Sequence, residues 1–248
     1  MRVESVAPRV NAITLDGPTS DWWGCASRGQ DRSGHRRTVT STAARFSGRR
    51  HTVEVQTSWL EGDEDRLPAA GVAARALRDN PTSVAVSVDP LARFELFHGV
   101  FLGMLQGAVG VAARRGGCVL GVAAATAPGS SCVGQWLPPE SRVPSDPRPE
   151  ASDLDRLLRV GSVSAANDLA DDHWHVGPVA VEPGFQGVGI GHVVMRTLCD
   201  HIDDCGDLAW LETDKIENVL FYTSLGFELV SEVPVLSTSC WFMRREPR

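Results

Sequence analysis

Apolar residues along the chain follow clear periods only from about residue 52 onward. Residues 52–57 alternate apolar and polar side chains, which predicts a strand, whereas residues 61–80 and 90–106 have the amphipathic period of helices. Two further predicted strands, residues 109–114 and 118–126, are joined by a short glycine-containing turn and form a hairpin. The first part of the periodic region therefore mixes strands and helices.

The second part of this region begins with a proline-rich stretch over residues 127–150, which predicts an irregular crossing loop, and continues with a helix over residues 151–170. The next strand, residues 174–181, is interrupted by Gly177-Pro178. Because proline cannot donate to a strand ladder, this dipeptide predicts a bulge and the loss of hydrogen bonds to one neighbouring strand. A glycine-rich turn then leads into a helix over residues 192–201.

Charge is distributed unevenly along the 248 residues, whose net charge is −7. Residues 1–51 contain nine arginines and four acids, a net charge of +5, so residues 52–248 carry −12. We interpret residues 1–51 as a poorly ordered basic leader and residues 52–248 as the folded domain. A basic arm that contacts nucleic acid or an acidic partner, and an over-extended reading frame, are the alternatives for the leader.

The acidic domain offers no long-range attraction to phosphate backbones or anionic lipid, so we expect no nucleic-acid or membrane partner and favour a cationic substrate. Six cysteines without C-x-x-C spacing predict reduced thiols. The first residues contain no apolar secretory core, and the most apolar stretch, residues 99–113, is too short to span a bilayer. We therefore expect a cytoplasmic monomer or homodimer.

The glycine-rich turn, QGVGIG at residues 186–191, is the first segment that suggests chemistry. Its glycines allow successive backbone N–H groups to point into one concave turn at the start of a helix, where the helix dipole favours a phosphate. The spacing differs from the dinucleotide-binding G-x-G-x-x-G fingerprint, and no G-K-[ST] of a Walker A loop follows. For this turn alone, phosphate binding and ordinary tight packing both stay open.

Two further blocks follow: LAWLET at residues 208–213 and NVLFYTSLGF at residues 218–227. With the V-A-V-x-P strand and the Q-G-x-G-I-G turn, they resemble the GNAT superfamily of N-acetyltransferases in order and spacing over about the last 75 residues. The LET and FYxxLGF blocks and the WFMRR run near the end are most similar to the puromycin N-acetyltransferase-like branch. The resemblance implies an α/β (α+β) fold: a mixed, mostly antiparallel sheet of about seven strands, flanked by helices and splayed after the V-A-V strand.

The resemblance also implies acetyl-coenzyme A as the acetyl donor. Its pyrophosphate would lie on the amides of the glycine-rich turn, and its pantetheine arm would pair with the V-A-V strand as a substitute strand. Asn218 would hydrogen-bond the pantetheine or the turn that holds it, or would cap the following helix. The expected coenzyme-binding residues are Val179, Ala180, Val181, Gln186, Gly187, Val188, Gly189, Ile190, Gly191, Asn218 and Tyr222.

Tyr222, the only tyrosine in the chain, is the predicted general acid. Attack of a neutral amine on the thioester ends in a thiolate whose conjugate acid has a pKa of about 8.5 if cysteine is a fair model, and a phenol with a pKa of about 10 can protonate it while staying neutral at rest. The alternative is a core aromatic between Phe221 and Phe227. Glu212, at the carboxyl end of a strand, is the predicted general base, with a strand-capping charge as its alternative.

His173 and His175 are two residues apart and therefore share one face of a strand. Such a pair could bind a metal or relay protons, but no third ligand has suitable spacing in the sequence, so we predict no metal. Acceptor selection is expected in the first two helices, the proline-rich loop and the chain end near Trp241.

The sequence therefore predicts an acetyl-CoA-dependent N-acetyltransferase that acts by direct attack on a primary amine of a small, cationic, antibiotic-like or polyamine-like molecule. Protein amines are an alternative acceptor. The alternative class is a non-catalytic acyl-CoA-binding or regulatory domain, and a phosphate-loop kinase is disfavoured because the sole lysine, Lys215, lies away from the glycines.

Overall fold

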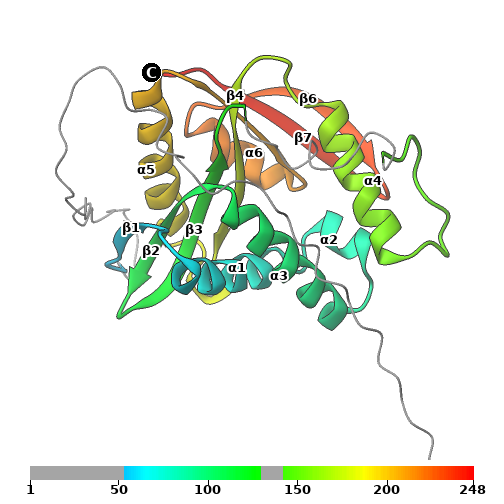
Figure 1. The fold of residues 1–248 in the computed structure, drawn as a ribbon, viewed down its shortest axis with the longest axis horizontal. Coiled ribbons are helices and arrows are strands. Elements are labelled where there is room, and N and C mark those ends of the chain that lie inside the picture. Colours follow the sequence, from blue (N-terminus) through cyan, green and yellow to red (C-terminus); the bar gives the residue numbers. More distant parts are fainter. Residues whose placement is uncertain (1–52, 130–141) are drawn as a thin grey trace, which may run out of the picture. The chain divides into compact units, whose positions relative to one another are not determined.

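A single seven-stranded sheet organises the part of the chain that the computed structural model describes, residues 53–129 and 142–248. The predicted leader and the middle of the proline-rich loop lie outside these ranges. The strand order is β1-β2-β3-β4-β5-β7-β6, and every neighbouring pair is antiparallel except β4 and β5 (Figure 1). The strands are β1 (Gln56–Trp59), β2 (Val109–Arg115), β3 (Cys118–Thr126), β4 (His173–Val181), β5 (Leu208–Thr213), β6 (Glu228–Val235) and β7 (Thr238–Arg245).

Six α-helices lie in these described ranges, and their ends follow local signals. The helix predicted over residues 61–80 ends at Leu77, and a separate short helix begins at Pro81, because proline at the first helical position favours a new start. Asp89 caps the following helix by accepting hydrogen bonds from the amides of Leu91 and Ala92 at 2.8 and 2.9 Å. The helices are α1 (Asp63–Leu77), α2 (Pro81–Val86), α3 (Pro90–Gln106), α4 (Asp153–Ala166), α5 (Ile190–Cys205) and α6 (Ile216–Thr223).

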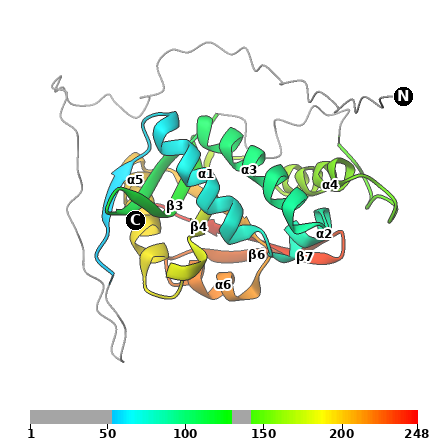
Figure 2. The same cartoon turned by 90° about the horizontal axis from the view of Figure 1, so that it is seen from below.

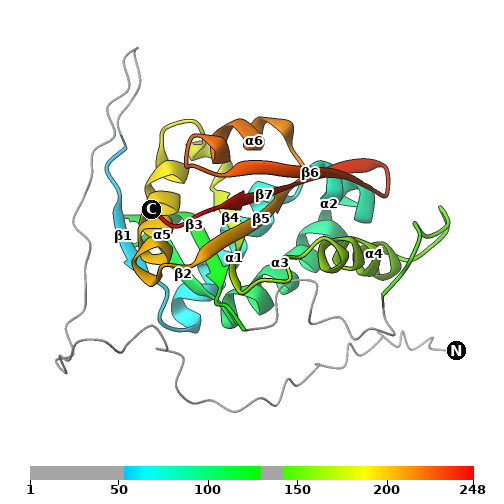
Figure 3. The ribbon, with the colours of Figure 1, turned by 90° about the horizontal axis from the view of Figure 1, so that it is seen from above.

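The sheet is covered on both faces, with α1, α3 and α4 on one side and α6 on the other (Figures 2 and 3). Alternation along β3 explains this arrangement: Ala123 and Ala125 pack into the core under α5, whereas Val122 and Ala124 pack into the core under α1 and α3. A third cluster lies under α4 and contains Trp210 and Phe242. Small side chains in β3 therefore let helices approach both faces closely.

The predicted bulge lies in β4. Ala123 pairs with Val179 and Ala125 pairs with Val176, so Gly177 and Pro178, joined by a cis peptide bond, stand opposite the single residue between them. Pairing of β4 with β5 is confined to residues 173–175 of β4. The two parallel strands therefore separate from Val176 onward, already before the V-A-V segment. Among the described helices, none has both the length and the apolar character needed to cross a membrane.

Candidate active site

The glycine-rich turn forms the entrance to α5. Gly187 and Gly189 have φ angles of 74° and 95°, values in the left-handed region that glycine adopts without strain, and Gly189 is the N-cap of the helix. The first helical hydrogen bond runs from the Val193 amide to the Gly189 carbonyl at 3.2 Å. The amides of residues 190–192 precede it and point out of the helix end, the arrangement that suits a phosphate.

The predicted coenzyme residues of this turn differ in what their side chains do. Gln186 is exposed and donates a hydrogen bond from Nε2 to the Val181 carbonyl at 3.1 Å, which ties the turn to the end of β4. Val188 packs against the core, and Ile190 is only 2% exposed within it. A Cβ at Gly121 of β3 would lie 2.6 Å from Ile190 Cγ2, so the helix start sits tightly on the sheet. At residue 190 the side chain is buried, so its backbone is the part that can face a ligand.

The V-A-V segment presents one edge to the gap between β4 and β5. Val179 and Val181 are half-buried on the α5 side, whereas Ala180 is buried in the core under α1 and α3. Glu182, which follows directly, accepts hydrogen bonds from the Arg75 guanidinium at 2.8 to 3.1 Å. This pair connects α1 to the end of the strand beside the glycine-rich turn.

Helix α6 brings Asn218 and Tyr222 to the end of β5. The alternative interpretation, that Asn218 caps this helix, is wrong because Lys215 is the N-cap. Asn218 lies within the first helical turn and donates from Nδ2 to Thr213 Oγ1 at 3.0 Å, so it holds the helix against the last residue of β5. The spacing of four residues places Tyr222 on the same side of the helix.

Tyr222 is buried, with a relative exposure of 7%. Its ring packs edge-on against Phe221 and Phe227, with centroid distances of 5.0 and 5.8 Å. Burial raises the pKa of Tyr222 well above its ordinary value, and the negative charge of Glu212 raises it further. The ring therefore packs among core aromatics and its hydroxyl stays protonated at neutral pH, and the general-acid role of Tyr222 stays a prediction.

Glu212 lies on the opposite face of β5 from Thr213 and belongs to a buried polar cluster. His175 Nε2 lies 2.8 Å from Glu212 Oε2, and Ser164 of α4 donates to Glu212 Oε1 at 3.4 Å. The Glu212 side chain keeps 21% exposure, whereas that of His175 keeps 3%. Glu212 thus has one oxygen fixed by a histidine while part of the carboxylate still reaches solvent.

Asp168, which follows α4, completes the cluster. Its Oδ1 lies 3.0 Å from His173 Nε2 and 3.7 Å from His175 Nδ1. Burial acts to raise the pKa of Asp168, but the two histidines outweigh burial and hold that pKa well below its usual range. The expectation that His173 and His175 have no third ligand nearby is therefore wrong, because Asp168, in the segment between α4 and β4, lies beside both.

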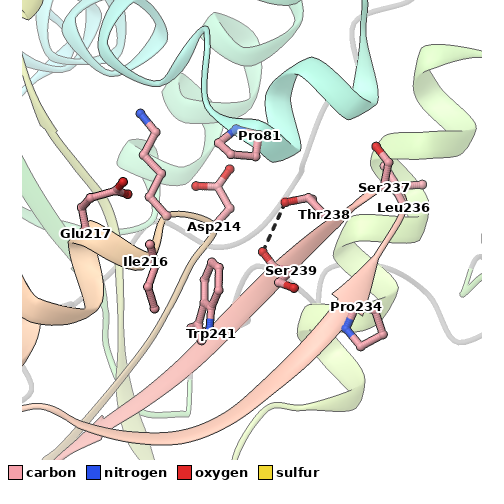
Figure 4. A pocket seen from close by; sticks show the side chains of 11 residues that line it. Pro81, Asp214, Ile216, Glu217, Pro234, Leu236, Ser237, Thr238, Ser239 and Trp241 are labelled. Carbon is pink, nitrogen blue, oxygen red and sulfur yellow. Dashed lines mark hydrogen bonds between the residues drawn. The ribbon is translucent and has the colours of Figure 1, made fainter.

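An open pocket of about 600 Å³ borders the carboxyl end of β5 (Figure 4). Asp214 and Lys215 follow β5 directly, Glu217 comes from α6, and Trp241 comes from β7. Figure 4 shows Asp214 directed toward the start of α2, where it accepts hydrogen bonds from Asn80 Nδ2 at 3.1 Å and from the Thr82 amide at 2.8 Å.

The sequence indicated Trp241 as an acceptor-site residue but missed Asp168, Asp214 and the β6–β7 hairpin at this pocket. For Asp168 the available signal was the group of one amide and three acids, Asn167, Asp168, Asp171 and Asp172, shortly before the two histidines. For Asp214 the available signal was its position directly after the LET block at residues 211–213. Both residues act through partners that are distant in the sequence.

A mixed sheet whose central parallel strands separate beside a glycine-rich helix start defines an acyl-coenzyme A-binding transferase fold. The model of the acetyltransferase (GNAT) family matches residues 91–227, more than half of the chain. The chain therefore belongs to the GNAT acetyltransferase family and is an acetyl-CoA-dependent N-acetyltransferase.

Solved structures with the same fold are distant in sequence. A polyamine N-acetyltransferase from Drosophila melanogaster matches with a TM-score of 0.54 and 16% identity, covering 77% of this chain and 99% of that one. An agmatine N-acetyltransferase variant gives 0.53 and 17% over the same shares. A protein described as histone acetyltransferase HPA2 and related acetyltransferase, from Corynebacterium glutamicum, gives 0.54 and 16%, covering 77% and 97%. At these identities the comparison shows the shared fold.

Proposed function

We propose that this enzyme transfers the acetyl group of acetyl-CoA to a primary amine of a small cationic molecule by direct attack. The observation that carries the proposal is that β4 and β5 stop pairing at Val176. Beyond that point, β4 continues toward the glycine-rich turn at the start of α5, and β5 continues to its carboxyl end. Glu212 and Tyr222 both come from the chain segment at that end. The puromycin-like branch and the cytoplasmic location stay predictions.

The residues present fit the donor. The unpaired edge of β4 can accept the two amides of the pantetheine arm as a substitute strand at Val179 and Val181. The open backbone at Gly187, where an added Cβ would meet nothing within 4 Å, leaves room for phosphate oxygens above the amides of residues 187–191. The donor supplies an activated acetyl thioester, and the protein supplies orientation and proton transfer.

The proposed reaction moves three protons: two leave the acceptor nitrogen and one reaches the sulfur. Glu212, or a water molecule that it binds, takes a proton from the ammonium group, and the neutral nitrogen attacks the acetyl carbon. As the new C–N bond forms and the C–S bond breaks, the Tyr222 hydroxyl gives its proton to the sulfur. After Glu212 has released the first proton to solvent, it takes the surplus proton from the nitrogen of the new C–N bond, and solvent returns a proton to Tyr222. The products are the N-acetylated acceptor and the free thiol.

The charge of the molecule supports a cationic acceptor. Residues 52–248 carry −12, and the described residues that line the pocket at the end of β5 include the acids Asp214 and Glu217 and, among them, one cation, Lys215. Because Asp214 already accepts two hydrogen bonds from the start of α2, Glu217 is the carboxylate that we assign to the acceptor. The names of two structural neighbours, agmatine and polyamine N-acetyltransferase, describe acceptors of this chemical class.

The test is a thiol-release assay with acetyl-CoA and a panel of agmatine, spermidine, an aminoglycoside, puromycin and short peptides with a free N-terminus. We expect turnover with at least one small polyamine-like or antibiotic-like amine and little with the peptides. Turnover confined to peptides would favour protein amines as acceptors. Coenzyme binding without turnover of any acceptor would favour a non-catalytic acyl-CoA-binding domain.

A further inference from the structure

The cluster of Asp168, His173 and His175 extends beyond what acetyl transfer requires. All three side chains are nearly inaccessible, with exposures of 7%, 4% and 3%. One ligand atom from each, a carboxylate oxygen and two ring nitrogens, lies within 4.8 Å of the other two. The cluster sits where the segment after α4 meets the start of β4, behind Glu212.

The distances within the cluster suit ligands around one ion. Tetrahedral bonds of about 2.0 Å to nitrogen and oxygen separate neighbouring ligand atoms by about 3.3 Å. The distances from Asp168 Oδ1 to His173 Nε2 and to His175 Nδ1, 3.0 and 3.7 Å, lie on either side of that value.

The second nitrogen of each ring faces an oxygen atom. His173 Nδ1 lies 2.8 Å from the Asp171 carbonyl oxygen, which can only accept, so Nδ1 carries a proton. His175 Nε2 lies 2.8 Å from Glu212 Oε2. Metal-binding histidines almost always donate their second N–H to a backbone carbonyl or a carboxylate in this way.

We propose that Asp168, His173 and His175 form a divalent transition-metal site, with zinc as the preferred ion. Two imidazoles and one carboxylate are a donor set for zinc, whereas magnesium and calcium prefer oxygen ligands alone.

The site would bind the segment after α4 to β4 and fix the ring plane of His175. Through the 2.8 Å contact of His175 Nε2 with Glu212 Oε2, it would also hold one oxygen of Glu212 in place. The assignment of the metal site itself is independent of the acceptor and of the proposed role of Glu212. A chain that binds zinc but acetylates none of the amines tested would leave the metal site standing.

The test uses the full chain with its affinity tag removed and purified without chelator. We expect about one zinc per chain by inductively coupled plasma mass spectrometry. After the zinc is stripped, calorimetry should show that zinc rebinds while magnesium does not, and a saturating hundredfold excess of zinc over Kd should raise the Tm by about 5 to 10 °C. Cobalt in place of zinc should give the visible d–d absorption of a tetrahedral site.

Two variants assign the ligands. Asp168→Asn and His173→Asn should each lower zinc affinity by at least about 100-fold, because each removes a ligand. The control is His98→Asn, which changes a half-buried histidine of α3 that stacks on Phe94 and should bind zinc as the unchanged chain does. Equal zinc affinity in the unchanged chain and Asp168→Asn would overturn the proposal.

The cobalt spectrum of the unchanged chain decides the question if the variants do not fold. A spectrum without tetrahedral d–d bands, together with a purified chain that holds no zinc, would mean that the cluster is a metal-free ion-paired network.

Discussion

A mostly buried ion pair between Arg245 and Asp203 holds the last strand, β7, against α5, and its removal should lower the free energy of unfolding. Arg245 of β7 donates to both carboxylate oxygens of Asp203 at 2.6 and 2.7 Å, and its Nε donates to the Leu225 carbonyl at 3.0 Å. The side chains of Arg245 and Asp203 are 4% and 15% exposed. Because Leu225 belongs to the turn after α6, this arginine also supports the helix that carries Tyr222.

Asp203→Asn keeps the shape of the side chain and removes its charge, which leaves a buried guanidinium without its counterion. Breaking a buried pair in this way costs about 3 to 5 kcal/mol, and the partial exposure of Asp203 places the expected loss near 3 kcal/mol. For a domain of this size, that loss lowers Tm by about 6 to 12 °C and the urea midpoint by about 1 M or more.

The loss should depend on pH. The hydrogen bonds from Arg245 hold the pKa of Asp203 below its usual value, against the opposing effect of burial. A carboxylate with a depressed folded-state pKa contributes stability above its unfolded pKa of about 3.9, and that contribution disappears as the pH falls through the folded value. The difference in unfolding free energy between the two chains should therefore be complete at pH 7 and narrow below about pH 4.

Urea unfolding followed by circular dichroism measures this difference. The control is Asp204→Asn, which changes the next residue of α5, an exposed one, and should alter the unfolding free energy by less than about 0.5 kcal/mol. A loss below about 1 kcal/mol in Asp203→Asn at pH 7, or a loss of the same size at pH 3, would refute the reasoning.

Two further predictions concern the site. Glu212→Gln should lower kcat by about 10² to 10⁴ and leave the Kd of coenzyme A unchanged, because it removes the proton acceptor but none of the coenzyme contacts. Steady-state kinetics and calorimetry measure the two constants, and Glu228→Gln, a change at an exposed residue, is the control. An unchanged kcat would exclude Glu212 as the base. Gly189→Ala should weaken coenzyme A binding and cost about 1 to 2 kcal/mol of stability, because Gly189 has a φ of 95°. The control is Gly184→Ala on the same loop, where an added Cβ meets nothing within 4 Å, and it should change neither coenzyme binding nor stability.

Local signals account for what the sequence predicted well. The helix over residues 90–106 and the strand over 118–126 have the predicted ends, because Pro90, the Gly116-Gly117 turn and the apolar periods act within a few residues. The bulge at Gly177-Pro178 was predicted for the same reason, since proline cannot continue a ladder wherever it occurs.

The features that the sequence did not predict depend on contacts between distant segments. Asp168 meets His175 only because the segment after α4 packs against the start of β4, and Asp214 binds the start of α2 across 132 residues. The alternative of a helix cap at Asn218 is wrong, because Lys215 takes the N-cap position and the Asn218 side chain donates to Thr213. Periodicity does not encode such pairings.

The central claim is that Tyr222 gives the proton to the leaving thiolate. Tyr222→Phe keeps the ring between Phe221 and Phe227 and removes only the hydroxyl, and no other tyrosine is present to replace it. Thr223→Val removes a hydroxyl from the next, exposed residue and serves as the control.

The measurement is kcat with the best acceptor of the amine panel, alongside the Kd of coenzyme A. We predict that Tyr222→Phe lowers kcat by about 10² to 10⁴ with Kd changed by less than about twofold, while Thr223→Val changes neither. A Tyr222→Phe enzyme that turns over as fast as the unchanged chain would contradict the account.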